Sequence, residues 1–272
     1  MNHEYSIMYP FRLCAIALSH LSRLLTQTIV GLLLLCITLL CWSSPVQAAS
    51  QVSPKLEEQV LQVIREHPEV ILESVQAYQQ RVQQQLQQAQ QAFVQELKRN
   101  PQAVIGESPT TGASQSKIVM VEFSDFQCPY CGRAHKTVQR FMAKHQDQVT
   151  LTYKHYPLAS IHPQAISAAK AAWAAFQQGK FWEYHDVLFT QQEKLGESFY
   201  IETAKNLNLD VDQFNRDRNS QAAETAISQD IQLAESLGIT GTPFFVMNGE
   251  VFTGAIELEE MEKRFTRVKQ SL

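Results

Sequence analysis

Two cysteines placed directly after an apolar segment, Cys128 and Cys131, constrain the fold most strongly. Residues 118–123 form an apolar run typical of a buried strand, and a helix is expected from Pro129 to about His145. Proline suits the first turn of a helix, because its missing N–H would have no partner there. The sequence therefore predicts a strand that delivers Cys128 to the start of a helix.

This position favours the thiolate form of Cys128. The free N–H groups of a first helical turn and the positive end of the helix dipole stabilise an anion. Cysteines in such settings have pKa values of about 3.5–7.5, below the usual value of about 8.5. Cys131 follows one turn later, close enough for a disulfide, and we expect it to be more buried and less acidic. The pattern predicts an attacking thiol and a resolving thiol.

Two other uses of the cysteine pair are open. A structural disulfide across so short a loop would constrain the unfolded chain little and stabilise the fold weakly. A metal site could use Cys128, Cys131 and His135, but structural zinc takes four ligands and no cysteine follows Cys131. Soft Cu(I) could be bound by two thiolates alone. Redox chemistry, with no cofactor and no metal, is the favoured interpretation.

Residues 1–48 are expected to be a signal peptide. Arg12 and Arg23 precede an apolar run over residues 29–42, shorter than the about 20 residues of a membrane span. Residues 46–48, Val-Gln-Ala, form a candidate cleavage site. An uncleaved membrane anchor is the alternative. Both interpretations export the rest of the chain, because basic flanks stay on the cytoplasmic side.

The composition fits an exported protein whose cysteines act as one pair. The chain has 272 residues and a formal net charge of −4, so no basic surface for nucleic acid is expected. Three of its five cysteines lie within residues 1–48, which excludes a scaffold of several disulfides in the remainder. The expected compartment is the periplasm or an equivalent lumen, where disulfides persist.

Residues 49–100 are expected to be a helical, glutamine-rich region. Ser53 and Pro54 indicate a helix start, and Pro68 should end that helix and begin another. The second helix carries an apolar stripe with a period near 3.67 residues, too narrow to be stable alone. Either further copies of this chain or its own C-terminal domain should cover the stripe, and a disordered tract is the third possibility. The stripe comprises Val75, Tyr78, Val82, Leu86, Ala89, Phe93 and Leu97.

The C-terminal part is expected to be one domain over residues 118–272, joined by a linker over residues 101–117. A second strand is predicted over residues 149–156, and a helical insertion over about 158–238. A hairpin turning at Asn248-Gly249 and a last helix over residues 257–268 complete it. Six aromatic residues are expected in the core of the insertion, and two histidines at the surface. These are Trp173, Phe176, Phe181, Trp182, Phe189 and Phe199, and His155 and His162.

This part of the chain resembles the DsbA family of exported thiol–disulfide oxidoreductases. Three features carry the resemblance: residues 122–131 with their Cys-Pro-Tyr-Cys motif, the helical insertion, and Gly241-Thr242-Pro243 before the hairpin. The resemblance implies an α/β fold of the thioredoxin type, interrupted by a helical domain. It implies that Cys128 attacks and Cys131 resolves. Substrate-binding positions are implied at Pro129, Tyr130, Thr242 and Pro243, with Pro243 in the cis form.

The same resemblance implies a buried acid at Glu122. Such a carboxyl group would have a raised pKa and could accept a proton from Cys131. Lys154 is a candidate partner for Glu122. The alternatives are an ordinary solvent-facing glutamate and a strand-end lysine in water.

Residues 63–73 resemble the N-terminal extension of ScsC-type proteins, which implies a homo-oligomer, a trimer, formed through residues 55–99. The expected function is a dithiol oxidase that exchanges disulfides with cysteines of exported client proteins and works with a membrane redox partner. A disulfide isomerase or reductase kept in the dithiol state is the alternative. A holdase or copper-binding module without turnover is the hypothesis from another class.

Overall fold

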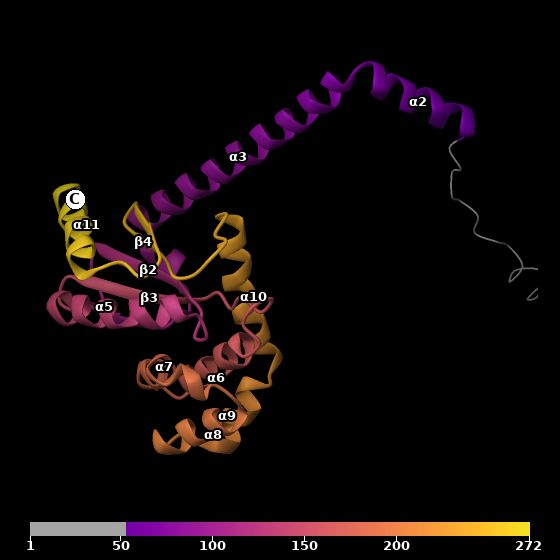
Figure 1. Cartoon of the computed structure of the whole chain (residues 1–272). Helices are drawn as coiled ribbons and strands as arrows, with labels where there is room; N and C mark the ends of the chain where they lie inside the picture. Colours follow the sequence, from indigo (N-terminus) through magenta and orange to yellow (C-terminus); the bar gives the residue numbers. More distant parts are fainter. Residues whose placement is uncertain (1–52) are drawn as a thin grey trace, which may run out of the picture. The chain divides into compact units, whose positions relative to one another are not determined.

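The computed structural model describes residues 53–272, which divide into two compact units (Figure 1). The first contains residues 53–71 of the described chain, and the second is Leu72–Leu272. The expected signal segment, residues 1–48, lies outside the described residues. Within residues 53–272, no helix is both long enough and apolar enough to cross a bilayer.

Both N-terminal helices begin where the sequence predicts. The first, α2 (Pro54–Glu66), is capped by Ser53, whose Oγ accepts a hydrogen bond from the Leu56 N–H at 3.3 Å. The second, α3 (Pro68–Arg99), starts at the expected proline. No side chain of α2 is buried, and its apolar face is at least 39% exposed at Leu56, Val60, Leu61, Val63 and Ile64.

The apolar stripe of α3 is covered only at its C-terminal end. Phe93 and Leu97 are buried in a cluster with the sheet, and Gln90 Nε2 donates to the Leu237 carbonyl oxygen at 2.8 Å. Val75 and Tyr78, about five and four turns before Phe93, are 47% and 62% exposed. The chain's own domain therefore covers one end of the predicted stripe and leaves the other end open.

Within the described residues the core is a five-stranded sheet in the order β1-β3-β2-β4-β5. Strands β2 and β3 are parallel, and the other neighbours are antiparallel. The β4–β5 hairpin turns at Asn248 and Gly249, both with positive φ, as the sequence predicts. The strands are β1 (Thr110–Gly112), β2 (Ile118–Ser124), β3 (Val149–His155), β4 (Phe244–Met247) and β5 (Glu250–Thr253).

Helices cover both faces of this sheet. On one face, α5 (Pro129–His145) and α11 (Leu258–Gln270) pack through Phe141, Met261 and Phe265. On the other face lie the end of α3, the short α4 (Pro101–Ile105) and α10 (Gln221–Ser236). The buried residues of this second face include Leu97, Val104, Ile105, Val119, Phe123 and Ala234.

The expected linker over residues 101–117 is wrong in structural terms. Val104 and Ile105 are buried in α4, and Thr110–Gly112 pairs with β3 as an edge strand. Composition alone indicated a loop because Gly, Ser and Thr are frequent here, but long-range contacts with the sheet override that local preference. The folded domain therefore begins inside α3, well before residue 118.

The insertion between β3 and β4 consists of helices, as predicted. They are α6 (Ala165–Gln177), α7 (Phe181–Thr190), the 3-10 turn η1 (Gln192–Lys194), α8 (Glu197–Asn206), α9 (Val211–Arg218) and α10. Of the expected core aromatics, Phe181, Phe189 and Phe199 are buried, and Phe176 and Trp182 pack against them. Trp173 differs, because it lines an open pocket. This arrangement is a thioredoxin-like fold with a helical insertion, the predicted fold class.

Candidate active site

Cys128 lies at the N-cap of α5, directly before the first helical residue, Pro129. Its backbone N–H donates to the Asp125 carbonyl oxygen at 3.1 Å, which closes the turn between β2 and α5. Both cysteines carry free thiols, and both are buried, with 4% exposure for Cys128 and none for Cys131. The predicted order, with Cys131 the more buried, is confirmed.

The two thiols have opposite pKa shifts. The hydrogen bond from the Cys131 thiol is the largest cause that lowers the pKa of Cys128, to about 5. Burial opposes this shift, while the Tyr130 and Cys131 N–H groups of the first helical turn support it. Burial is the main cause that raises the pKa of Cys131, and the neighbouring Cys128 adds to it. At neutral pH the geometry therefore favours a thiolate at Cys128 and a thiol at Cys131.

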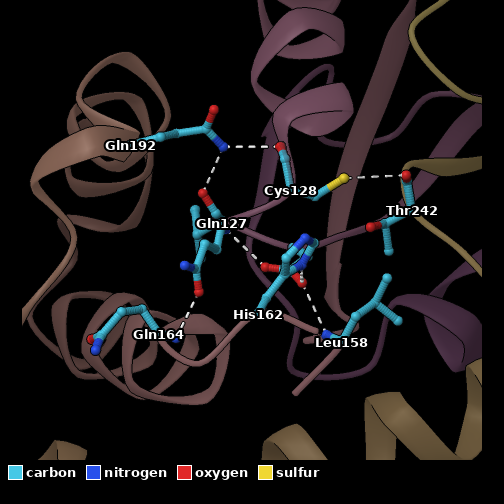
Figure 2. Close-up of polar contacts among 9 residues, drawn as sticks. Gln127, Cys128, Leu158, His162, Gln164, Gln192 and Thr242 are labelled. Atoms are coloured by element: carbon cyan, nitrogen blue, oxygen red, sulfur yellow. Dashed lines mark hydrogen bonds and ion pairs between the residues drawn. The ribbon is translucent and has the colours of Figure 1, made fainter. Parts of the chain in front are cut away.

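The segment before β4 faces the attacking position. The Thr242–Pro243 peptide bond is cis, as the resemblance implied, and Pro243 is buried. The Cys128 Sγ lies 3.4 Å from the Thr242 carbonyl oxygen, to which it donates a hydrogen bond when the thiol is protonated (Figure 2). Pro129 and Tyr130 are exposed beside the sulfur, and the Arg133 guanidinium lies 4.3 Å from the centre of the Tyr130 ring. The four positions implied for substrate binding thus surround the Cys128 sulfur or adjoin it in the chain.

Glu122 is a buried carboxyl group in the middle of β2, with 2% exposure. Burial raises its pKa to about 7. Its register neighbour on β3 is Tyr153, a fully buried phenol whose pKa is raised by burial first and then by the charges of Glu122 and Cys131. The charges of Glu122 and Cys131 therefore act on the same buried phenol.

Lys154 is not the partner of Glu122. In the parallel β2–β3 register, Glu122 pairs with Tyr153, whereas Lys154 pairs with Phe123 and so points to the opposite face of the sheet. There the Lys154 ammonium donates to Ser108 Oγ at 2.7 Å and lies 3.3 Å from the Asp230 carboxylate.

The turn before Cys128 is organised by the Asp125 carboxylate. It accepts hydrogen bonds from the Gln127 N–H at 2.8 Å, the Leu158 N–H at 2.9 Å and His162 Nδ1 at 2.7 Å (Figure 2). The prediction that His155 and His162 lie at the surface is wrong. His162 is tied to this buried carboxylate, and His155 is 3% exposed, because β3 carries it into the core.

The helical insertion also contacts this turn directly. Gln192 Nε2 donates to the Phe126 carbonyl oxygen at 2.7 Å and to the Cys128 carbonyl oxygen at 2.9 Å (Figure 2). A Cβ atom at Gly132 would clash with the Gln192 amide oxygen, so the Gln192 side chain would have to move if Gly132 were replaced. Gln127 Oε1 accepts from the Gln164 N–H at 2.6 Å.

Residues 119–266, more than half of the chain, match the DSBA-like thioredoxin domain. The chain belongs to the DsbA-like family. This is a family of thiol–disulfide oxidoreductases.

Solved structures agree with the DsbA-like assignment. A thioredoxin-like oxidoreductase from Silicibacter pomeroyi DSS-3 is 31% identical, with a TM-score of 0.58 over 63% of this chain and 98% of that one. Proteus mirabilis ScsC in a transitional conformation is 22% identical, with a TM-score of 0.57 over 81% of this chain and 100% of that one, a likeness of fold alone.

Among curated proteins, the Na(+)/H(+) antiporter NhaA 3 of Salinispora tropica is 35% identical over 150 residues. The match covers 55% of this DsbA-like chain but only 23% of the antiporter. The chain thus spans about a quarter of the length of the curated relatives it matches.

Sequence reasoning missed three residues of this DsbA-like site: Asp125, Gln192 and Tyr153. Asp125 had a local signal, because an aspartate side chain often accepts a hydrogen bond from the backbone N–H two residues further on, here that of Gln127. Gln192 and Tyr153 had none, since their roles depend on which distant residues the insertion and β3 place beside the cysteines. The arrangement can stabilise a thiolate at Cys128, keep Cys131 as a protonated resolving thiol, and provide a buried acid, Glu122, that can exchange protons.

Proposed function

We propose that the protein is an exported dithiol oxidase that transfers the Cys128–Cys131 disulfide to cysteines of other exported proteins. The single observation that carries this proposal is the stabilised thiolate at Cys128. A thiolate that is stable after reduction favours the reduced form of the pair, and this makes the disulfide a strong oxidant. Membership of the DsbA-like family supports thiol–disulfide exchange as the reaction. The stabilised thiolate at Cys128 supports oxidation of the client as its direction.

In the proposed reaction, a substrate thiolate attacks the Cys128 sulfur of the disulfide. The Cys128–Cys131 bond breaks, a mixed disulfide forms at Cys128, and Cys131 leaves as a thiolate. A second substrate thiolate then attacks the substrate sulfur of the mixed disulfide and releases Cys128. The substrate loses two electrons and forms a disulfide, while the pair gains two electrons.

The two pKa shifts determine which cysteine takes up a proton during the reaction. Cys131, whose pKa is raised, takes up a proton once it has left, whereas Cys128 remains a thiolate at neutral pH. Glu122, with a pKa near 7, is suited to give that proton to Cys131 and to accept it back when the pair is re-oxidised. We assign Glu122 this role because it pairs with Tyr153 in the sheet, and the charge of Cys131 acts on the same buried tyrosine.

Client binding is proposed at the surface around Cys128. An extended client segment would pair with the backbone at Thr242 and Pro243, as in strand addition. Tyr130, which is 55% exposed, would contact the client side chains. We assign re-oxidation of the cysteine pair to a redox partner in the membrane. The domain that carries the pair would act in the periplasm or an equivalent lumen, with residues 1–48 either removed as a signal peptide or kept as a membrane anchor.

A disulfide isomerase or reductase is the second candidate, and the exposed apolar helix face supports it. Leu56, Val60, Ile64 and Val75 are 39–50% exposed on α2 and α3, which favours association of several copies through this region. Several dithiol sites around one stalk would suit the reshuffling of misfolded clients.

Two measurements test these functions. Equilibration with glutathione buffers gives the reduction potential, for which we expect an oxidising value close to that of strong oxidants of the thioredoxin fold. A low potential would instead support the reductase. Cys131→Ser should trap mixed disulfides with client proteins, while Cys128→Ser should trap none. If Cys131→Ser traps no client, a holdase or copper-binding role without turnover replaces the enzyme.

A further inference from the structure

Helices α5 and α7 lie side by side (Figure 1), and a second cluster of polar side chains comes from these two helices, one turn along α5 from Cys131. His135 comes from α5, and His185 and Asp186 come from α7. One nitrogen or oxygen atom from each residue lies within 4.8 Å of the other two. His135 Nε2 is 3.6 Å from Asp186 Oδ1, and His185 Nδ1 is 3.0 Å from the same oxygen.

Both imidazoles are buried, yet neither is fully hydrogen-bonded. His135 is 3% exposed and His185 is 4% exposed. Among the described residues, no hydrogen-bond partner reaches the buried Nε2 atom of either ring. Buried polar atoms without partners are rare because they lose their hydration without compensation. The unpartnered His135 Nε2 lies 3.6 Å from the Asp186 oxygen that His185 Nδ1 also faces, and this arrangement points to a ligand bound between the three side chains.

Solvent can reach the cluster through a pocket. The pocket has a volume of about 340 Å³ and is lined by His135, His185, Asp186, Trp182 and Met142, among others. Asp186 is 46% exposed at its mouth, so a small ion can enter without unfolding the domain.

We propose that His135, His185 and Asp186 bind a divalent first-row transition metal ion of the zinc type. Two imidazoles and one carboxylate suit Zn²⁺ and its neighbours, whereas Mg²⁺ and Ca²⁺ prefer oxygen ligands alone. Ligand atoms on one Zn²⁺ at about 2.0–2.2 Å lie roughly 3.4 Å apart, so the cluster must close slightly around the ion. The pocket leaves a further coordination position open to water.

This site differs from the metal site that the sequence suggested, because it uses neither cysteine. Its position has a mechanical consequence. His135 belongs to the helix that starts at Cys128, and His185 and Asp186 belong to the insertion, so a bound ion would join the sheet layer to the helical domain.

The test uses the full chain with all five cysteines replaced by serine, so that thiolates bind no metal. Equilibrium dialysis against Zn²⁺ should give one ion per chain. His135→Gln and His185→Gln should each weaken Zn²⁺ binding at least about tenfold, since even residues that only orient metal ligands cost about 10–100-fold. His145→Gln is the matched control, because His145 lies on the same helix but bonds Glu262.

The Co²⁺ complex of the same protein gives a readout that needs no histidine variant. Intense visible absorption typical of four or five ligands, displaced by Zn²⁺, would support the site. Only the weak spectrum of hydrated Co²⁺, or Zn²⁺ binding that persists unchanged when His135→Gln and His185→Gln are combined, would overturn it. Circular dichroism of each variant shows whether lost binding reflects lost folding.

Discussion

Gln192, in the helical insertion, donates a hydrogen bond to the carbonyl oxygen of Cys128 at 2.9 Å. Its amide nitrogen also reaches the carbonyl oxygen of Phe126 at 2.7 Å, so one side chain spans the turn that positions the attacking sulfur. The insertion thus contributes to the geometry of the dithiol site as well as covering it.

Gln192→Ala should destabilise the protein by about 1–3 kcal/mol, because each lost hydrogen bond contributes about 0.5–1.5 kcal/mol. The rate of Cys128 alkylation should also change, since the turn before the sulfur loses its support. Chemical denaturation and alkylation kinetics measure the two effects. Gln191→Ala is the matched control, and an equal effect in both variants would contradict the assignment.

Gly132→Ala should act through the same contact. The added Cβ would lie 2.2 Å from the Gln192 amide oxygen, so this amide must leave the turn. We therefore expect a double-mutant cycle with Gln192→Ala to be strongly non-additive, the double variant being little less stable than either single variant. Additive losses of stability would show that the two residues act independently.

The thiolate of reduced Cys128 should titrate near pH 5, as followed by ultraviolet absorbance of the thiolate. Because this pKa is lowered in the folded state, its stabilisation of the reduced protein is present above the unfolded value and is lost as pH falls through about 5. Reduction of the disulfide should take up two protons below that pH and one above it. Cys128→Ser should abolish the transition, and a midpoint near 8.5 would contradict the proposed direction.

Glu122→Gln should make the protein more stable in alkaline solution but not in acid. The pKa of Glu122 is raised from 4.5 to about 7, so its ionisation destabilises the folded state progressively between those values. The gain should be near zero below pH 4.5 and roughly 3 kcal/mol at pH 8, since one pKa unit corresponds to about 1.4 kcal/mol. The exposed Glu202→Gln should show no such pH-dependent gain.

The two halves of the apolar stripe on α3 should respond differently to substitution. Leu97→Ala should cost about 2–5 kcal/mol of folding stability, because Leu97 is buried against the sheet. Val75→Gln with Tyr78→Gln should leave that stability unchanged and lower the mass in solution, if copies associate through the exposed half. A chain that begins at residue 80 keeps the buried half, and an equal number of copies per particle for it and for residues 49–272 would refute the association.

Local signals in the sequence were enough to predict the elements that carry the cysteines. Pro129 after Cys128 defines a helix start, and Asn248-Gly249 defines a hairpin turn, because both depend on the conformational preferences of the residues themselves. The cis Thr242–Pro243 bond was predicted from resemblance, and the structure contains it.

Predictions failed where they depended on strand register or on distant contacts. Lys154 was a candidate partner of Glu122, but alternation along β3 turns Lys154 to the face where Asp230 lies. His135 and Asp186 are about fifty residues apart in the sequence, so no spacing could indicate that they meet. Such pairs are fixed by the packing of whole elements against one another.

The short strand β1 has a consequence for solubility. Its residues Thr110–Gly112 pair with β3, and the Trp182 indole N–H donates to the Thr110 carbonyl oxygen at 2.7 Å, which fastens the strand in place. Without β1, the N–H and C=O groups of one side of β3 would be unpaired and would form a template for strands of other molecules. Aggregation of the catalytic domain is therefore prevented in part by three residues that take no part in thiol chemistry.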